Sequence, residues 1–211
     1  MTPQPIGSAE EDVAIFFACF AAEHGVATVT YNYRGVGATA RAHPHLRMRD
    51  WLLEDAPAAT AFATQRFASI PQVAVGHSLG GHALLLGAGG EHVTRFASVA
   101  SHLAATTAIP SRSELVRVAA ILGVIDDPSF DARDRAEATT VPILAVGVDD
   151  DPWSAPAAID ALVAAAGGPV ERRQYSPADL DQERVGHHGL FRRGAGARFW
   201  PELVEWLTRT S

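Results

Sequence analysis

Residues 71–89 read PQVAVGHSLGGHALLLGAG, an apolar run that changes into a helical pattern at a single serine, Ser78. Gly76, Ser78 and Gly80 form a G-x-S-x-G sequence at this change. A sharp strand-to-helix turn strains its central residue and brings strand and helix so close that glycine is needed two residues to either side. The stretch predicts that Ser78 projects as a nucleophile from the carboxyl end of a strand. The alternative is a glycine-rich turn with an incidental serine.

Strand-like and helix-like segments alternate along the rest of the chain. Strands are expected at 25–33, 72–76, 96–100, 141–148 and 170–175, and helices at 10–23, 48–67, 79–87, 156–166 and 199–208. Apolar runs such as VAVG and VPILAVGV are typical of parallel strands covered on both faces. The sequence therefore predicts an α/β fold, a mostly parallel sheet with helices on both faces, in a single domain over residues 1–211. Residues 102–140 break the rhythm and are expected to form a small helical cap or insertion.

Composition excludes several classes of function. The chain has 211 residues and a formal charge of −7, and it has no basic stripe of the kind that binds nucleic acid. No apolar run approaches the roughly 18 residues of a membrane span, and the N-terminus lacks the cationic start of a secretory signal. Cys19 is the one cysteine, which excludes an internal disulfide and fits a reducing cytoplasm, where we expect the protein. We expect Cys19 to be a small core residue.

A nucleophilic serine needs a base, and the base needs a carboxylate that orients it. In a fold with a G-x-S-x-G turn the acid and then the histidine follow, each after a later strand. Three consecutive carboxylates, Asp149, Asp150 and Asp151, end the strand candidate at 141–148, and His187 and His188 lie in the loop after the last one. His77, next to the serine, is expected to point elsewhere and to be structural.

Several motifs carry a family resemblance. YNYRGVGAT, VAVGHSLGG, GVDDDPW and VGHHGLF, followed by FWPELVEWL, resemble the α/β-hydrolase superfamily from about residue 10 to the end. The later motifs resemble in particular a bacterial group with a late G-H-x-G-x-F sequence. The resemblance implies that Ser78 is the nucleophile and His187 the base, since His188 occupies a position that is usually aromatic. Counted from Gly147 in a G-x-x-D pattern, the acid is expected to be Asp150, with Asp151 its nearest rival.

The N-terminal part of the sequence bears on two features, the oxyanion hole and the first strands of the sheet. The Leu79 N–H, at the start of a helix, is expected to face the developing oxyanion. The resemblance implies a second donor from a loop ahead of the first helix, and Ile6 or Gly7 would supply it. Compared with the family, the first strands are missing. An exposed sheet edge is therefore expected, and such an edge would favour a homo-oligomer.

The function expected from these features is that of a serine hydrolase. It would cleave an ester, thioester or amide of a small-molecule acyl substrate through an acyl-enzyme, without a metal or organic cofactor. Trp153 is expected either to line an acyl pocket or to pack in the core. The alternatives are a catalytically impaired binding or structural module on the same fold, and lyase or perhydrolase chemistry with the same triad.

Overall fold

Four parallel strands form one sheet, and their order across the sheet is their order along the chain. They are β1 (Val73–His77), β2 (Arg95–Val99), β3 (Ile143–Val148) and β4 (Val170–Tyr175). The computed structural model describes residues 9–36, 39, 42, 43, 46, 48–102 and 132–209. In these ranges no helix is long and apolar enough to cross a membrane.

The helices are spread along the whole chain. They are α1 (Ala9–Glu23), α2 (Met48–Asp50), the π-helical turn η2 (Trp51–Asp55), α3 (Ala56–Arg66), α4 (Leu79–Leu86), α6 (Ala132–Ala138), α7 (Pro156–Val163) and α8 (Arg193–Thr208). Short 3₁₀ helices are η3 (Gly89–His92), η4 (Ala178–Leu180) and η5 (Gly189–Phe191).

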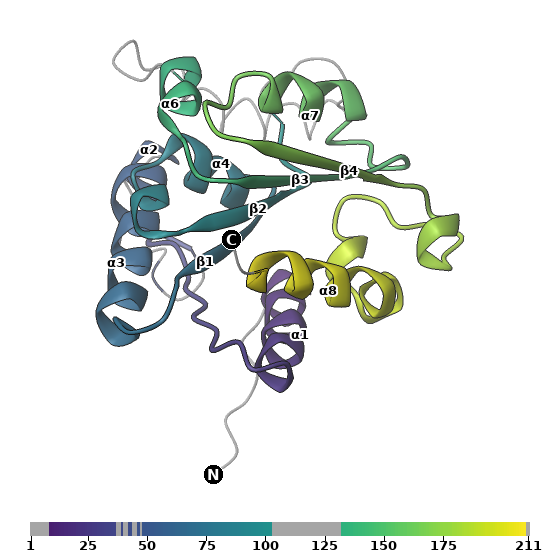
Figure 1. Cartoon of the computed structure of the whole chain (residues 1–211), viewed down its shortest axis with the longest axis horizontal. Helices are drawn as coiled ribbons and strands as arrows, with labels where there is room; N and C mark the ends of the chain where they lie inside the picture. Colours follow the sequence, from purple (N-terminus) through teal and green to yellow (C-terminus); the bar gives the residue numbers. More distant parts are fainter. Residues whose placement is uncertain are drawn as a thin grey trace.

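Helices cover both faces of the sheet, with α1 and α8 on one side and α2, α3, α4, α6 and α7 on the other (Figure 1). Alternate strand residues point to opposite faces. Val99 and Val146 belong to the core cluster with α1 and α8, whereas Phe96 and Ile143 pack with α4 and α7. The predicted fold class, a parallel sheet covered on both faces, is confirmed.

Four of the five expected strands form, each within two residues of its expected bounds. The last helix begins earlier than expected, at Arg193, and takes in the RGAGA sequence. Its glycines look unfavourable for a helix, but the ring of Trp200 lies where a side chain at Gly196 would be, 2.4 Å from a Cβ placed there. Tertiary packing thus outweighs the low helix propensity of glycine.

The strand expected at 25–33 is not formed, so that expectation is wrong. Residues 26–33 are irregular and mostly exposed, and Tyr31 is 44% exposed. The end of the run is held by side chains, because Asp55 pairs with Arg34 and the Trp51 indole donates to the Arg34 carbonyl. High β-propensity needs a neighbouring strand to act on, and within the described residues none pairs with this run. In the part of the chain that the structure describes, the sheet therefore ends at β1.

Cys19 is exposed and is not the expected core residue. Phe17 and Ala21, four residues apart, are the buried positions of this part of α1. A residue two positions from Phe17 is turned by about 200° and so faces away from the core. The expected insertion at 102–140 falls largely on residues 103–131, which lie outside the described residues. Its final part contains α6.

The approach of β1 to α4 at Gly76 gives a stability prediction. A Cβ at Gly76 would lie 2.3 Å from the backbone carbon of Gly80, whereas one at Gly80 would meet nothing within 4 Å. Gly76→Ala should therefore lower the free energy of unfolding by about 3 kcal/mol, since backbone cannot yield as a side chain does. Gly80→Ala, the matched control, should be neutral or slightly stabilising by urea unfolding. Equal effects of the two substitutions would contradict the steric explanation.

Candidate active site

Ser78 lies at the sharp turn between β1 and α4. Its backbone angles are φ 51° and ψ −111°, a positive φ that side-chain-bearing residues rarely adopt. The amide of Ser78 donates to the Val99 carbonyl over 2.8 Å, and the Ser101 hydroxyl donates to the Ser78 carbonyl over 2.8 Å. The strained turn is therefore fastened to the end of β2, with the Ser78 side chain at its apex.

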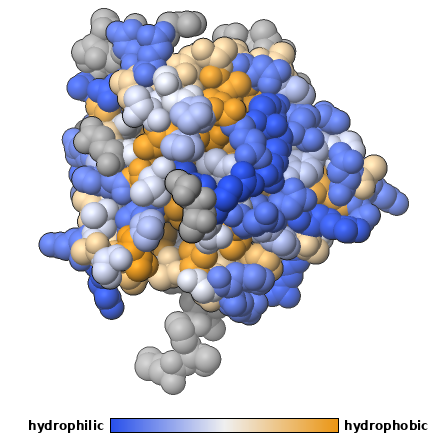
Figure 2. Space-filling view, viewed as in Figure 1, coloured by the Kyte–Doolittle hydropathy of each residue, from blue (hydrophilic) through white to orange (hydrophobic). Residues whose placement is uncertain are grey.

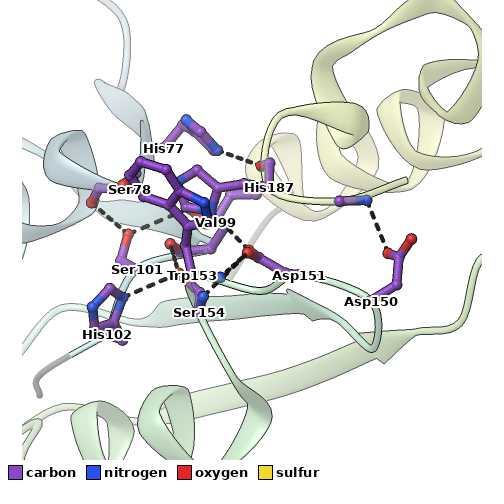
Figure 3. A network of polar contacts seen from close by, with 12 residues as sticks. His77, Ser78, Val99, Ser101, His102, Asp150, Asp151, Trp153, Ser154 and His187 are labelled. Atoms are coloured by element: carbon purple, nitrogen blue, oxygen red, sulfur yellow. Dashed lines mark hydrogen bonds and ion pairs between the residues drawn. The ribbon is translucent and has the colours of Figure 1, made fainter. Parts of the chain in front are cut away.

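A buried carboxylate–imidazole pair joins two segments. Asp151 lies in the turn after β3, and His187 lies in the loop after β4. Asp151 Oδ2 accepts from Nδ1 of His187 over 2.8 Å, and Asp151 Oδ1 accepts the amides of Trp153 and Ser154 (Figure 3). Burial by itself would raise the pKa of Asp151, but the hydrogen bonds from His187 and the two amides hold that pKa below its usual value. The carboxylate thus stays ionised and fixes the imidazole with its Nδ1–H toward Asp151 and Nε2 as the acceptor.

The acid expected from counting, Asp150, does not contact the imidazole. Its two carboxylate oxygens accept the backbone amides of Val185 and Gly186, each over 2.9 Å. The chain turns directly after β3, where the amide of Asp151 donates to the Val148 carbonyl over 3.2 Å. This turn directs the third carboxylate, and not the second, to the ring of His187. The expected pairing of Asp150 is corrected accordingly.

His77 was expected to point elsewhere, but its side chain contacts the same loop. Its Nε2 donates to the backbone carbonyl of His187 over 2.8 Å, and its ring lies 4.8 Å from the ring of His187 between centroids. Burial lowers the pKa of His77 to about 3, and repulsion from His187 adds to this. The ring is therefore neutral, and its single proton is on the nitrogen that makes this bond.

The indole of Trp153 lies against the imidazole of His187, with centroids 5.5 Å apart and planes inclined by 20°. Trp153 was considered for an acyl pocket or the core, and this contact places it at the candidate base. The ring of His188 meets that of His187 edge-on at 4.8 Å. His187, one of the two expected histidines, bonds the carboxylate of Asp151.

Further side chains join the strand ends, and no sequence motif marked them. The hydroxyl of Ser154 donates to the Ala100 carbonyl over 2.6 Å, so the Nδ1–H of His102 donates to Ser154 over 3.1 Å. Burial lowers the pKa of His102 to about 4, with a contribution from His82, which donates to the His102 carbonyl. These contacts fasten the loop after β3 to the end of β2.

Three groups at this site have no hydrogen-bond partner within the described part of the chain. They are the Ser78 hydroxyl, Nε2 of His187 and the amide of Leu79, the first residue of α4. A hydroxyl, a ring nitrogen that accepts and a helix-terminal N–H are the groups that acyl transfer requires. The bond from serine to histidine is often loose before substrate binds. The other expected donor, Ile6, lies outside the described residues.

Comparison with known proteins gives a family for the chain. The profile of the family described as serine aminopeptidase, S33 matches residues 16–122, about half of the chain. The match includes Ser78 and ends before Asp151 and His187. No curated protein matches the chain in sequence.

Many solved structures share the fold. A serine hydrolase from Cycloclasticus zankles, a bacterium that degrades polyaromatic hydrocarbons, has a TM-score of 0.63 at 13% identity, covering 95% of this chain and 85% of its own. Est1E from Butyrivibrio proteoclasticus, with ferulic acid bound, has a TM-score of 0.62 at 16% identity, with 95% and 83% covered. The esterase EaEST from Exiguobacterium antarcticum has a TM-score of 0.60 at 15% identity, with 94% and 87% covered. At such identities the likeness shows the fold alone.

The neutral, half-buried His77 predicts how stability depends on pH. In the unfolded chain a histidine takes up a proton below pH 6.5, whereas His77 in the folded protein stays neutral down to about pH 3. Protonation thus favours the unfolded state, and stability is lost as the pH falls below 6.5. By pH 4.5 we expect His77 to account for a loss of roughly 3 kcal/mol, two pH units at about 1.4 kcal/mol each.

Urea unfolding at a series of pH values measures this effect. His77→Gln should flatten the decline between pH 6.5 and 4.5, and the exposed His92→Gln is the matched control. A decline as steep in His77→Gln as in the wild type would show that His77 is not its source.

Proposed function

Because the chain belongs to the serine aminopeptidase S33 family of α/β hydrolases, we propose that it hydrolyses an acyl substrate with Ser78 as nucleophile, His187 as base and Asp151 as acid. The observation that carries the proposal is the buried 2.8 Å bond between Asp151 and His187, beside the strained turn of Ser78. The bond from His77, the neighbour of Ser78, to the His187 carbonyl brings the two parts together.

Acylation follows from the orientation of the imidazole. With Nδ1–H bonded to Asp151, the lone pair on Nε2 takes the hydroxyl proton as Ser78 Oγ bonds to the substrate carbonyl carbon. The carbonyl oxygen becomes an oxyanion, and the Leu79 amide at the start of α4 donates to it. When the bond to the leaving group breaks, the imidazolium returns the proton to that group, leaving an acyl-enzyme on Ser78.

Deacylation uses the same groups in reverse. Nε2 of His187 takes a proton from water, and the water oxygen attacks the acyl carbonyl. Collapse of the second tetrahedral intermediate releases the acid and returns the proton to Ser78. Asp151 stays ionised throughout and stabilises the imidazolium in both halves of the cycle.

Esters, thioesters and amides are the substrate class that this chemistry serves. The fold neighbours include esterases, and Est1E has ferulic acid bound. We propose an ester of a small carboxylic acid as the first substrate to test, because an ester has a better leaving group than an amide. A series of p-nitrophenyl esters of increasing acyl length would define the preference.

Labelling with a fluorophosphonate probe tests the nucleophile and its partners. Ser78→Ala should abolish labelling, whereas the exposed Ser69→Ala should leave it unchanged. Asp151→Asn and His187→Ala should each lower ester turnover about 10³-fold or more, because the base is lost or held in the wrong tautomer. His188→Ala should lower turnover far less. Unlabelled but well-folded wild type, or equal losses in the two histidine variants, would contradict the assignment.

A second candidate role is association through the edge of the sheet, as in a binding or structural module. The outer edge of β1 has no strand partner within the described residues, and Val73, Ala74 and Val75 are partly buried. The opposite edge, β4, presents Glu171, Arg172, Arg173 and Gln174 in place of apolar residues. Charged residues protect an edge strand from pairing, and β1 lacks them. Figure 2 shows a hydrophilic band through the middle of the face in view and apolar surface to its left.

We propose a second copy of the chain as the partner of this edge. Sedimentation equilibrium should then give about twice the monomer mass of 22.3 kDa at micromolar concentration. Val73→Lys should weaken association about 10-fold while leaving the far-ultraviolet circular dichroism unchanged. A wild type that stays monomeric at 100-fold higher concentration would contradict this role.

A further inference from the structure

Two residues next to the proposed triad hold the backbone of the loop that carries His187. Asp150 precedes Asp151 at the end of β3, and His77 precedes Ser78 at the end of β1. The side chain of each reaches the main chain of the same loop, from two strands that are separated by β2.

Asp150 binds the loop from one side. Its two oxygens accept the amides of Val185 and Gly186, two consecutive donors, each over 2.9 Å. A carboxylate that accepts two amides makes charge-assisted bonds, which are stronger than neutral ones. Gly186 has a positive φ of 63°, so the loop bends at the residue held by Asp150. The next residue is His187.

His77 binds the loop from the other side. Its Nε2–H donates to the His187 carbonyl over 2.8 Å, and its ring packs edge-on against Phe191. Three consecutive residues are thus held through their main-chain groups, 185 and 186 by their amides and 187 by its carbonyl. The imidazole of His187 is separately held by Asp151.

We propose that His77 and Asp150 are positioning residues that clamp the 185–187 backbone and so fix where the imidazole of His187 lies relative to Ser78. The inference rests on the proposed function for its kinetic consequence, but the clamp is measurable without turnover. The hydrogen bonds of both side chains described above go to the main chain of the loop and not to the atoms proposed to react. Each acts through the loop, so its loss should lower kcat and leave KM nearly unchanged.

Asp150→Asn tests the first half of the clamp. The amide side chain keeps one acceptor and turns an NH₂ group toward two N–H donors, so at least one bond is lost. Asp149→Asn is the matched control, because it removes the same charge one residue away. Asp149 accepts from the side chain of Gln174, which an asparagine can also do.

Amide hydrogen exchange, measured by NMR in the inactive Ser78→Ala background, reports whether the Val185 and Gly186 amides are hydrogen-bonded. Asp150→Asn should speed exchange at Val185 and Gly186 by 10- to 100-fold, as expected for loss of a hydrogen bond to a charged group. Asp149→Asn should leave both rates within about 3-fold. Unchanged exchange in Asp150→Asn, or equal acceleration in Asp149→Asn, would overturn the clamp.

His77→Phe and His77→Gln test the second half. Phenylalanine keeps the ring but removes the donor, and glutamine restores an N–H at similar reach. His77→Phe should lower kcat about 10-fold with KM within 2-fold, and His77→Gln should recover most of the loss. Equal losses in the two variants would show that shape matters and the hydrogen bond does not.

The two proposals fail in different ways. A wild type that takes no fluorophosphonate label and cleaves no ester overturns the proposed function, and accelerated exchange in Asp150→Asn would still support the clamp. Normal labelling together with unchanged exchange overturns the clamp and leaves the function standing.

Discussion

The positive φ of Ser78 is the constraint on which the site depends. A serine in this conformation costs about 1–3 kcal/mol, so it persists only where the surroundings enforce it. The Val99 carbonyl accepts its amide, the Ser101 hydroxyl bonds its carbonyl, and the absent side chain of Gly76 lets α4 start directly against β1. Because the turn is fixed, the Leu79 amide at the helix start has no partner among the described residues, and His77 is directed to the loop of His187.

The end of β2 connects the two strands that carry the proposed nucleophile and acid. β2 lies between β1 and β3, and it supplies no residue to the proposed triad. The two residues that follow it nevertheless bond to both sides: Ser101 donates to the Ser78 carbonyl, and the Ala100 carbonyl accepts from Ser154 in the turn that follows Asp151. Ala100 itself has a positive φ of 53°, a second strained residue. Hydrogen bonds from two serine hydroxyls to backbone carbonyls thus hold the turn of Ser78 and the turn of Asp151 at a fixed distance.

The sequence predicts the parts of the structure that follow from local rules. The G-x-S-x-G turn and the buried parallel strands depend on spacing and side-chain type, and both appear near their expected positions. The choice among Asp149, Asp150 and Asp151 depends on how the chain turns after Val148, which counting cannot resolve. The strand expected at 25–33 failed because pairing requires a neighbouring strand, which no local propensity guarantees. The direction of His77 depended on a loop 110 residues away in sequence.

Burial and residue type together determine which side chains around His187 carry a charge. Burial keeps His77 and His102 neutral, so neither places a positive charge beside the imidazolium that His187 would form. His188 is the remaining imidazole in ring contact with His187 among the described residues. Asp151 is ionised and bonds the ring, and the Asp150 carboxylate is taken up by two backbone amides. A positive charge formed on His187 would thus meet the bonded carboxylate of Asp151, while burial holds the nearby rings of His77 and His102 neutral.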